Sequence, residues 1–446
     1  MRAISRPVSR LDGALRAPGD KSCSHRALMF AGLAEGVSHI EGLLEGEDVV
    51  NTAKAMSACG AQVERLSLRR WRVTGVGAQG LRAPETTLDM GNSGTGARLL
   101  MGLIAGQQIT AAFDGDSSLR SRPMSRVLEP LRQMGARCDS NDGLLPLTLE
   151  GAPLTGMEYV TPMASAQVKS CVMLAGLGAS GDTIVHERRK TRDHTERMLK
   201  AFGVNVGQSE DGEGGQRITV RGGQRLKASD VLIPGDPSSA AFLWAAGLLV
   251  GDGEVSVLNV MSNPTRDGLV EAVRRMGAYV DVTWESESGG ESLTRLTVKP
   301  STLAAYNPED DVVPNMIDEF PLFAVLAAFA EGDTVVTGAE ELRVKESDRI
   351  AATVAMLVAN GVYAEERPDG FLVRGCGRNG VPGGGVVTTH HDHRIAMSAL
   401  VMGCAAKAPV TIDDAAMINT SYPDFFAHMT ALGADMVREG DAESDW

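Results

Sequence analysis

The sequence lacks the features of membrane, secreted and disulfide-rich proteins. No apolar run reaches the roughly 18 residues of a membrane-spanning helix, and the longest candidate, 240–250, has the length of a buried helix. The first twenty residues hold four arginines but no apolar stretch typical of a signal peptide, so we expect no leader and a cytoplasmic protein. Cysteines are few and form no C-x-x-C pair, which argues against a disulfide framework or a structural zinc site and favours a reducing compartment. They stand at positions 23, 59, 138, 171, 376 and 404.

Positive charge is also in short supply. Lysine and arginine number 43 against 57 aspartates and glutamates, a formal net charge of −14. This balance argues against a nucleic-acid or anionic-membrane partner, which favours a basic face. An acidic protein can still bind anionic metabolites where a few cations converge. The length of 446 residues exceeds one ordinary core, so we expect two domains.

An internal repeat is the strongest organisational signal. Six segments each predict an amphipathic helix, a Gly-Ala or Gly-Val turn and a short strand. They are 51–63, 124–138, 194–206, 267–280, 348–364 and 424–436. Their turn glycines are Gly60, Gly135, Gly203, Gly277, Gly361 and Gly433. A glycine directly after a helix fits a left-handed C-cap, where a Cβ is unfavourable.

A second, more apolar helix followed by a strand alternates with each of these segments. These helices and strands are expected within 27–40, 97–113, 168–185, 241–258, 322–337 and 395–412. Since the helices are apolar on most sides, they should be largely buried. The pattern predicts an α/β protein of six units, arranged as two groups of three.

A repeated Pro-Gly-Asp phrase marks the expected domain junctions. It occurs at 18–20 and at 234–236, each time before a buried helix. We therefore predict a discontinuous domain 1 made of 1–20 and 236–446, with domain 2, 21–235, inserted into it. The two crossings, near 19–21 and 234–236, would form a double hinge.

Polar residues stand at the start of five of the six buried helices. In domain 2 they include Gly19–Arg26, Gly91–Gly96 and Ser165–Lys169, and free N–H groups at such helix starts favour an anion. Ser22 and Ser165 are candidate N-caps. Each segment also has an ordinary interpretation as a capped helix with solvated cations. Arg122 could equally be a solvated loop residue, and His194 a hydrogen-bonding residue at a helix start.

Domain 1 carries two more polar starts of buried helices, before 322–337 and 395–412, and a charged run before an amphipathic helix. Asp318 and Glu319 precede one apolar helix, and Asp318 could simply complement its dipole. The run 343–349 is highly charged, and such runs are usually solvated helix starts. Three histidines within 390–393 invite a metal interpretation, but no matching carboxylate–histidine set supports it. Cations gathered from both domains would suit a ligand with several negative charges, the pattern of a two-domain transferase.

These motifs resemble those of the EPSP synthases, most closely the bacterial class II form, over nearly the whole chain. Four signature patterns occur in order: 19–22 (GDKS), 165–169 (SAQVK), 192–196 (RDHTE) and 263–266 (NPTR). The resemblance implies two similar domains, each of three βαβαββ units, the enolpyruvyl transferase fold, also described as an inside-out α/β barrel. It also implies transfer of the enolpyruvyl group of phosphoenolpyruvate to the 5-hydroxyl of shikimate 3-phosphate, in chorismate and aromatic amino-acid biosynthesis.

The resemblance implies site residues where the motifs match. Lys21, Asp318 and Glu346 would be catalytic, with Asp318 as the base at the hydroxyl, Glu346 as the acid at C3, and Lys21 bridging both substrates. The contacts to shikimate 3-phosphate would be Lys21, Ser22, Arg26, Ser165, Ala166, Gln167, Arg192, Asp318 and Lys345. The contacts to phosphoenolpyruvate would be Lys21, Gly94, Arg122, Gln167, Arg349 and Arg394. No cofactor or metal is required, and we expect a monomer whose domains close on substrate.

Two positions and two alternatives qualify this assignment. Thr420 stands where many relatives outside class II have a lysine, so one phosphoenolpyruvate contact is missing. Gly94 is replaced by alanine in some glyphosate-tolerant relatives, and we therefore expect glyphosate to compete here. One alternative is a UDP-N-acetylglucosamine enolpyruvyl transferase, although the Ser22–Arg26 pair suits a small phosphorylated ring better. The other is a non-catalytic binder of anionic metabolites, which would gain nothing from Asp318 and Glu346.

Overall fold

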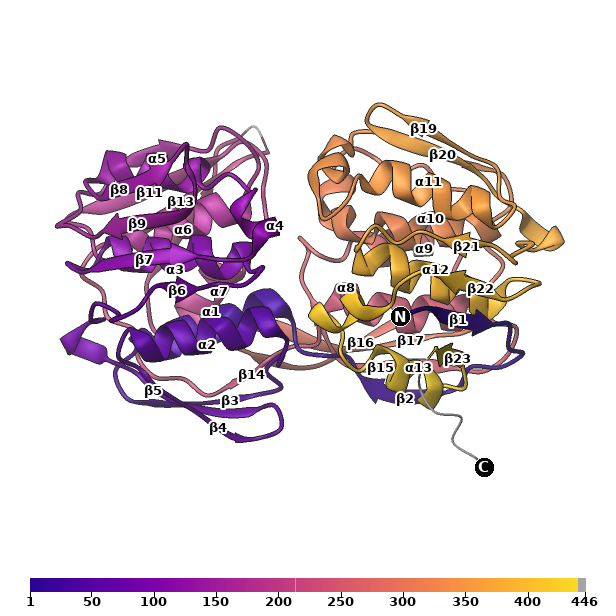
Figure 1. The fold of residues 1–446 in the computed structure, drawn as a ribbon, viewed down its shortest axis with the longest axis horizontal. Helices are drawn as coiled ribbons and strands as arrows, with labels where there is room; N and C mark the ends of the chain where they lie inside the picture. Colours follow the sequence, from indigo (N-terminus) through magenta and orange to yellow (C-terminus); the bar gives the residue numbers. More distant parts are fainter. Residues whose placement is uncertain (213, 440–446) are drawn as a thin grey trace. The chain divides into compact units, whose positions relative to one another are not determined.

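The computed structural model describes residues 1–212 and 214–439 and groups them into two compact units (Figure 1). Unit 1 comprises Met1–Pro18, Gly235–Ser286 and the chain from Ser292 onward, and unit 2 comprises Gly19–Pro234 and Glu287–Glu291. The divisions at 18/19 and 234/235 fall inside the two Pro-Gly-Asp phrases, one or two residues before the expected boundaries. The grouping of 287–291 with unit 2 has no counterpart in the sequence pattern.

Unit 2 consists of three helix-and-sheet repeats. Its helices are α1 (Lys21–Leu33), α2 (Glu47–Ala58), α3 (Gly94–Ala105), α4 (Ser117–Arg120), α5 (Ser125–Met134), α6 (Ala166–Leu177) and α7 (His194–Ala201). Its strands are β3 (Val37–Glu41), β4 (Gln62–Ser67), β5 (Arg70–Thr74), β6 (Leu88–Asp89), β7 (Thr110–Asp114), β8 (Arg137–Asn141), β9 (Leu144–Glu150), β10 (Glu158–Val160), β11 (Asp182–Glu187), β12 (Val206–Glu210), β13 (Gln216–Arg221) and β14 (Val231–Leu232).

Unit 1 repeats the same plan. Its helices are α8 (Pro237–Leu249), α9 (Gly268–Arg275), α10 (Phe320–Phe329), α11 (Arg349–Ala359), α12 (His393–Ala405) and α13 (Phe425–Ala431). Its strands are β1 (Ala3–Arg6), β2 (Gly13–Arg16), β15 (Val255–Ser262), β16 (Val280–Ser288), β17 (Glu291–Val298), β18 (Asp333–Val336), β19 (Ala364–Arg367), β20 (Gly370–Arg374), β21 (Val386–Val387), β22 (Val410–Ile412) and β23 (Asp435–Arg438). The short 3₁₀ turns are 77–79, 313–319, 340–344, 377–379 and 416–420.

Each repeat builds one small sheet of the same topology. The orders are β14-β3-β5-β4, β6-β7-β9-β8 and β10-β11-β13-β12 in unit 2, and β21-β22-β1-β23, β2-β15-β17-β16 and β18-β20-β19 in unit 1. The first strand pairs parallel to the second, and the remaining pairs are antiparallel, as for β6‖β7 and then β7 with β9 and β9 with β8. In the three-stranded sheet, a parallel bridge between Ala304 and Glu331 stands in the place of the missing strand. The expected six-unit α/β fold is confirmed.

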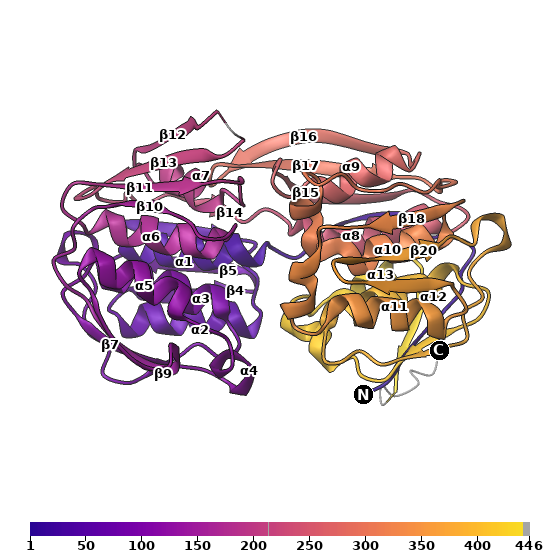
Figure 2. The same ribbon diagram turned by 90° about the horizontal axis from the view of Figure 1, so that it is seen from above.

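The two predicted classes of helix are both present. Helices α1, α3 and α6 form the interior of unit 2, and α8, α10 and α12 form that of unit 1, with sheets and the other helices around them (Figure 2). All six turn glycines have positive φ, from +78° at Gly361 to +119° at Gly135, so the predicted left-handed C-caps are confirmed. No helix of the described part of the chain is both long and apolar enough to cross a membrane.

Helices α3 and α6 pack with their backbones in close contact. A Cβ added to Gly102 on α3 would lie 2.4 Å from the carbonyl oxygen of Cys171 on α6. Only glycine allows this approach. It brings the N-terminal turns of the two helices together, and these turns carry two of the motifs predicted to bind substrate.

The turn between β16 and β17 belongs with unit 2. Gly289 and Gly290 form it with φ of +58° and +81°. The backbone N–H of Leu232 donates to Ser288 Oγ at 2.8 Å. Nearby, a Cβ on Gly290 would lie 2.6 Å from the carbonyl oxygen of Arg197. These contacts explain why 287–291 groups with unit 2.

Candidate active site

The N-terminus of α1 presents Lys21 and Ser22. Asp20, and not Ser22 as expected, is the N-cap, because its backbone is extended and its carboxylate accepts from Cys23 N at 2.7 Å. Ser22 is therefore a residue of the first turn, and its side chain is not needed for capping. Lys21 is one-third exposed, with Nζ 3.3 Å from Asp48 Oδ2. Both side chains remain accessible to a ligand.

Arg26, one turn further along α1, lies deeper in unit 2. Its guanidinium donates from Nε to Thr195 Oγ1 at 2.7 Å, from Nη2 to Ser170 Oγ at 3.0 Å and from Nη1 to the Ser22 carbonyl at 3.0 Å. The residue is only 3% exposed. It links α1 to α6 and α7, and its role as a substrate contact stays a prediction.

The glycine-rich loop before α3 is tied to α1 by a buried histidine. Ser93 caps α3 by accepting from Gly96 N at 3.0 Å, as helix N-caps commonly do. His25 Nδ1 lies 2.7 Å from Thr52 Oγ1, and its Nε2 lies 3.3 Å from Ser93 Oγ. The position of Gly94 therefore depends on α1.

Three predicted residues meet around this loop. Arg122 donates to Asn92 Oδ1 at 2.8 Å, and an added Cβ on Gly94 would lie 3.7 Å from Arg122 Nη1. Gln167 donates from Nε2 to Thr95 Oγ1 at 2.9 Å. Cations, backbone N–H groups and an amide gathered at one helix start suit a phosphate or carboxylate.

The sequence interpretation missed Arg98 at this site. Arg98 Nη1 donates to Gln167 Oε1 at 2.6 Å, and an added Cβ on Gly94 would lie 3.0 Å from the same nitrogen. Burial, then the charges of Arg126 and Arg122, lower the pKa of Arg98 to about 10, so it remains a cation near neutral pH. Its signal was a single arginine in an otherwise apolar helix, one turn after Gly94.

The SAQVK and RDHTE motifs meet through a buried charge cluster. Ser165 caps α6, as expected, accepting from Val168 N at 3.4 Å. Lys169 is fully buried, with Nζ 2.9 Å from Glu187 Oε2 and 2.8 Å from Glu196 Oε1. Burial lowers the pKa of Lys169, but the two carboxylates outweigh burial and raise it. This cluster anchors the loop that carries Arg192, which lies half-buried just before α7.

In unit 1, Arg349 joins the two predicted catalytic carboxylates. Its Nη1 lies 3.4 Å from Asp318 Oδ1, and its Nη2 donates to Glu346 Oε2 at 2.6 Å. The interpretation of 343–349 as a solvated helix start is wrong for Arg349, which is 1% exposed. The reason is a third carboxylate, Asp392, whose Oδ2 accepts from Arg349 Nε at 2.8 Å. Sequence spacing gave no signal that Asp392 would join a group 43 residues away.

The charges of Arg349 and Asp392 stabilise each other. Burial lowers the pKa of Arg349, but Glu346, Asp392 and Asp318 outweigh burial and raise it. Burial raises the pKa of Asp392, but the guanidinium of Arg349 outweighs burial and lowers it. A buried arginine surrounded by carboxylates cannot be neutralised, so it holds their positions.

Two more predicted cations border Asp318. Lys345 Nζ lies 3.9 Å from Asp318 Oδ1 and 2.7 Å from Glu341 Oε1. Arg394 Nη1 donates to the carbonyl oxygen of Asp318 at 3.1 Å. Thr420, at the position of the missing lysine, is exposed and donates to the Met417 carbonyl at 2.7 Å. In the three-histidine segment, His390 and His391 are exposed at the turn before α12, whereas His393 is buried in α12.

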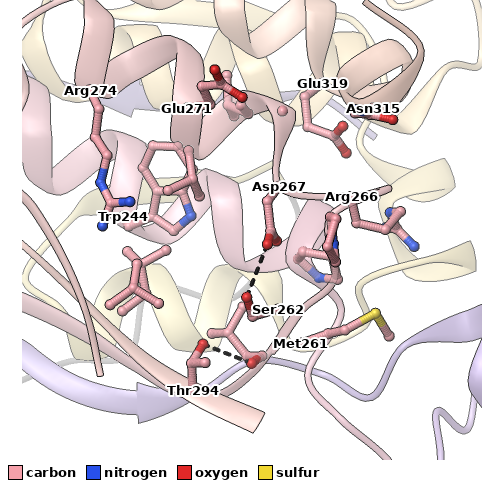
Figure 3. A pocket seen from close by; sticks show the side chains of 18 of the residues that line it. Trp244, Met261, Ser262, Arg266, Asp267, Glu271, Arg274, Thr294, Asn315 and Glu319 are labelled. Atoms are coloured by element: carbon pink, nitrogen blue, oxygen red, sulfur yellow. Dashed lines mark hydrogen bonds between the residues drawn. The ribbon is translucent and has the colours of Figure 1, made fainter. Parts of the chain in front are cut away.

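Unit 1 also holds a cavity of about 600 Å³ under α9 (Figure 3). Trp244, Val260 and Leu296 supply apolar walls, and the carboxylates of Asp267 and Glu319 face it. Its charged lining pairs three carboxylates with three arginines, so it offers no excess of positive charge for two anionic substrates. These residues are Asp267, Glu271, Glu319, Arg266, Arg274 and Arg275. Arg266 of the NPTR motif lies at its edge, donating to Ser238 Oγ at 2.9 Å and approaching Asp236 Oδ1 at 3.4 Å. This arginine ties the motif to the start of α8.

Comparisons with known proteins agree on one family. The family model described as EPSP synthase (3-phosphoshikimate 1-carboxyvinyltransferase) matches residues 5–429. A 3-phosphoshikimate 1-carboxyvinyltransferase from Hyphomonas neptunium is 58% identical over 434 residues, covering 97% of this chain and 99% of the relative. One from Afipia carboxidovorans is 54% identical over 436 residues, covering 97% and 98%.

Solved structures show the same likeness. EPSP synthase from Acinetobacter baumannii matches with a TM-score of 0.90 and 41% identity, covering 98% of this chain and all of that chain. The enolpyruvyl transferase NikO from Streptomyces tendae matches with a TM-score of 0.75 and 18% identity, covering 98% of each chain. The second likeness speaks for the fold alone.

Proposed function

Because this chain belongs to the EPSP synthase family, we propose that it transfers the enolpyruvyl group of phosphoenolpyruvate to the 5-hydroxyl of shikimate 3-phosphate. It is an enzyme, a 3-phosphoshikimate 1-carboxyvinyltransferase, and its products are EPSP and phosphate. The named relatives do not favour the UDP-N-acetylglucosamine alternative. The observation that carries the assignment of residues is the Arg349 group, in which one buried guanidinium binds both Asp318 and Glu346.

Substrate contacts are proposed on both units. Shikimate 3-phosphate would be bound by Lys21, Ser22, Arg26, Ser165, Ala166, Gln167, Arg192, Asp318 and Lys345. Phosphoenolpyruvate would be bound by Lys21, Gly94, Arg122, Gln167, Arg349 and Arg394. To the second set we add Arg98, because it lies 2.6 Å from Gln167 and would face the same ligand. Arginine forks suit carboxylate and phosphate groups because they bind both oxygens at once.

Asp318 is the proposed base. Its carboxylate lies 3.9 Å from Lys345 Nζ and 3.4 Å from Arg349 Nη1, and these two side chains fix its position. As the 5-hydroxyl loses its proton to Asp318, its oxygen attacks C2 of phosphoenolpyruvate, and C3 takes a proton from Glu346. The tetrahedral intermediate then loses phosphate, which carries away the proton from Asp318, and returns one C3 proton to Glu346, which restores the double bond. Lys21 neutralises charge that develops on the substrates.

A single substitution separates catalysis from binding. Asp318→Asn should retain binding of shikimate 3-phosphate, measured by calorimetry, while turnover falls on the order of 10²–10⁴-fold. Asp310→Asn, which changes an exposed aspartate outside the group, is the matched control and should leave both unchanged. Equal turnover in the two variants would remove Asp318 from the mechanism.

The reaction itself is tested by phosphate release from phosphoenolpyruvate. Release with shikimate 3-phosphate and not with UDP-N-acetylglucosamine is the expected result. Release with the second acceptor alone would overturn the substrate assignment. Binding with no release would favour the non-catalytic alternative.

Closure of the two domains on substrate is a further part of the proposal. Cations on both units would repel when no ligand is bound, and an anionic substrate would relieve that repulsion. The hinge would lie near 19–21 and 234–236, in a monomeric, cytoplasmic enzyme. Small-angle scattering should show compaction when shikimate 3-phosphate is added, and an unchanged radius of gyration would count against closure.

A further inference from the structure

Three buried residues that the proposed reaction does not use lie together in unit 2. Cys23 comes from α1, His194 from the start of α7, and Glu291 from the end of the β16–β17 turn. One potential ligand atom from each, a sulfur, a nitrogen and an oxygen, lies within 4.8 Å of the other two. Across residues 1–212 and 214–439, this is the one group of three or more such side chains found this close. All three are buried, at 0 to 1% exposure.

His194 contacts Glu291 through one ring nitrogen. Its Nδ1 lies 2.7 Å from Glu291 Oε1, and its Nε2 is buried without a hydrogen-bond partner. Since Glu291 is itself one of the three ligands, an ion would take the place of this hydrogen bond. Nε2 has no partner to lose when the ring turns toward the ion.

The donor types select the class of ion. Thiolate, imidazole and carboxylate together suit zinc and similar transition metals, whereas magnesium and calcium prefer oxygen alone. Zinc bonds to these atoms are about 2.0–2.3 Å long, so two ligand atoms of one ion stand about 3.5 Å apart. The His194–Glu291 pair, at 2.7 Å, would have to separate slightly, and the other pairs, which lie within 4.8 Å, would adjust about the same ion. A thiolate and a carboxylate supply two negative charges for the ion, and Arg197 Nε, 3.9 Å from Glu291 Oε2, offsets part of the second.

We propose that Cys23, His194 and Glu291 form a binding site for one divalent transition-metal ion of the zinc class, and that its occupation inhibits the enzyme. The inhibition is inferred from the position of the three ligands beside predicted substrate contacts. This part of the proposal rests on the proposed function. Cys23 shares the first turn of α1 with Lys21 and Ser22, and His194 follows Arg192 by two residues. Drawing the three ligands together shifts both helix starts, and with them the predicted substrate contacts.

Binding should release a proton and strengthen as the pH rises. The buried Cys23 binds an ion only as the thiolate, so its thiol loses a proton on binding. The same burial argues against Cys23 as a catalytic nucleophile, because a reactive cysteine needs an accessible thiolate. Lys21 and Arg26, on the same helix, disfavour an added cation and should keep the site weaker than a permanent structural zinc site.

The test uses Co²⁺ as a spectroscopic probe of the full-length, chelator-treated protein. The expected result is saturable 1:1 binding with a thiolate-to-cobalt charge-transfer band that Zn²⁺ abolishes by competition. Cys23→Val should lose the band, and His194→Gln and Glu291→Gln should each weaken binding by about tenfold or more. Cys59→Ala removes another buried thiol of unit 2 and should change nothing.

The outcomes are separable. A cobalt complex without the charge-transfer band, or equal binding by wild type and folded Cys23→Val, would overturn the site. Binding without loss of turnover would overturn the inhibitory role. Failure of the proposed function would appear instead as no turnover in metal-free wild type, while the cobalt titration is unaffected.

Discussion

Lowering the pH from 7 to 5 should weaken unit 2 through one buried histidine. His25 is fully buried between the hydroxyls of Thr52 and Ser93. Burial, followed by the charges of Lys21 and Arg26, lowers its pKa from 6.5 to about 3. In the folded protein His25 therefore stays neutral across this range, whereas in the unfolded chain it gains a proton.

The sign and size follow from proton linkage. The unfolded state binds more protons than the folded state below pH 6.5. The contribution of His25 to the free energy of unfolding is therefore fully present above pH 6.5 and is lost as the pH falls toward 3. At pH 5 the difference from 6.5 is 1.5 units, and each unit corresponds to about 1.36 kcal/mol. The free energy of unfolding of unit 2 should therefore be about 2 kcal/mol lower at pH 5. This difference corresponds to a fall of about thirtyfold in hydrogen-exchange protection.

Hydrogen exchange read by mass spectrometry suits this test, because it reports on unit 2 peptides separately in a two-unit protein. His25→Asn cannot titrate and should lose about 2 kcal/mol less than wild type between pH 7 and 5. His391→Asn changes an exposed histidine of unit 1 and should follow wild type. A His25 ring resonance that titrates near pH 6.5, or an equal loss in His25→Asn, would refute the reasoning.

Three other substitutions test packing and the phosphate loop. Lys169→Met leaves two carboxylates buried without their cation and should destabilise unit 2 by about 3–5 kcal/mol in urea denaturation; a loss below 1 kcal/mol would contradict this. Gly102→Ala places a methyl 2.4 Å from the Cys171 carbonyl and should cost about 1–3 kcal/mol by the same measurement. Gly94→Ala places a methyl 3.0 Å from Arg98 Nη1 and 3.7 Å from Arg122 Nη1, both at the far ends of long side chains, and should fold normally. Its KM for phosphoenolpyruvate and its inhibition constant for glyphosate should both rise about 10- to 100-fold in initial-rate assays, and unchanged values would refute the placement of Gly94.

The sequence predicted the repeat well because each helix and turn of the repeat is specified by residues close together in the sequence. A helix with one apolar face, followed by glycine, specifies both the helix and its left-handed end, as at Gly135 and Gly203. Helices that are apolar on most sides, such as α10, have to be buried. The family motifs added the expected substrate residues, since each motif is a short run at the start of a helix.

Local sequence patterns gave the wrong or no prediction at three places: the N-cap of α1, the charged run around Arg349, and Arg98. Ser22 was expected to cap α1, but Asp20 does so, and the choice depends on the extended backbone before the helix. The charged run around Arg349 predicts a solvated helix start, because nothing within it indicates a buried partner. Arg98 was hidden among apolar residues, although its position one turn after Gly94 could have been noticed.

By itself, the sequence determined the alternation of helices and strands, the six repeats and the positions of the helix starts, because each depends on residues within about one turn or one strand of each other. Only the tertiary structure decided which distant side chains meet. Arg349 reaches Asp392 across 43 residues. His194 reaches Glu291 across 97, through a turn that the repeat did not indicate. Such pairs form only when the repeats pack against each other. The same packing removes water from the charged groups, and only then does a buried charge need a partner of opposite sign.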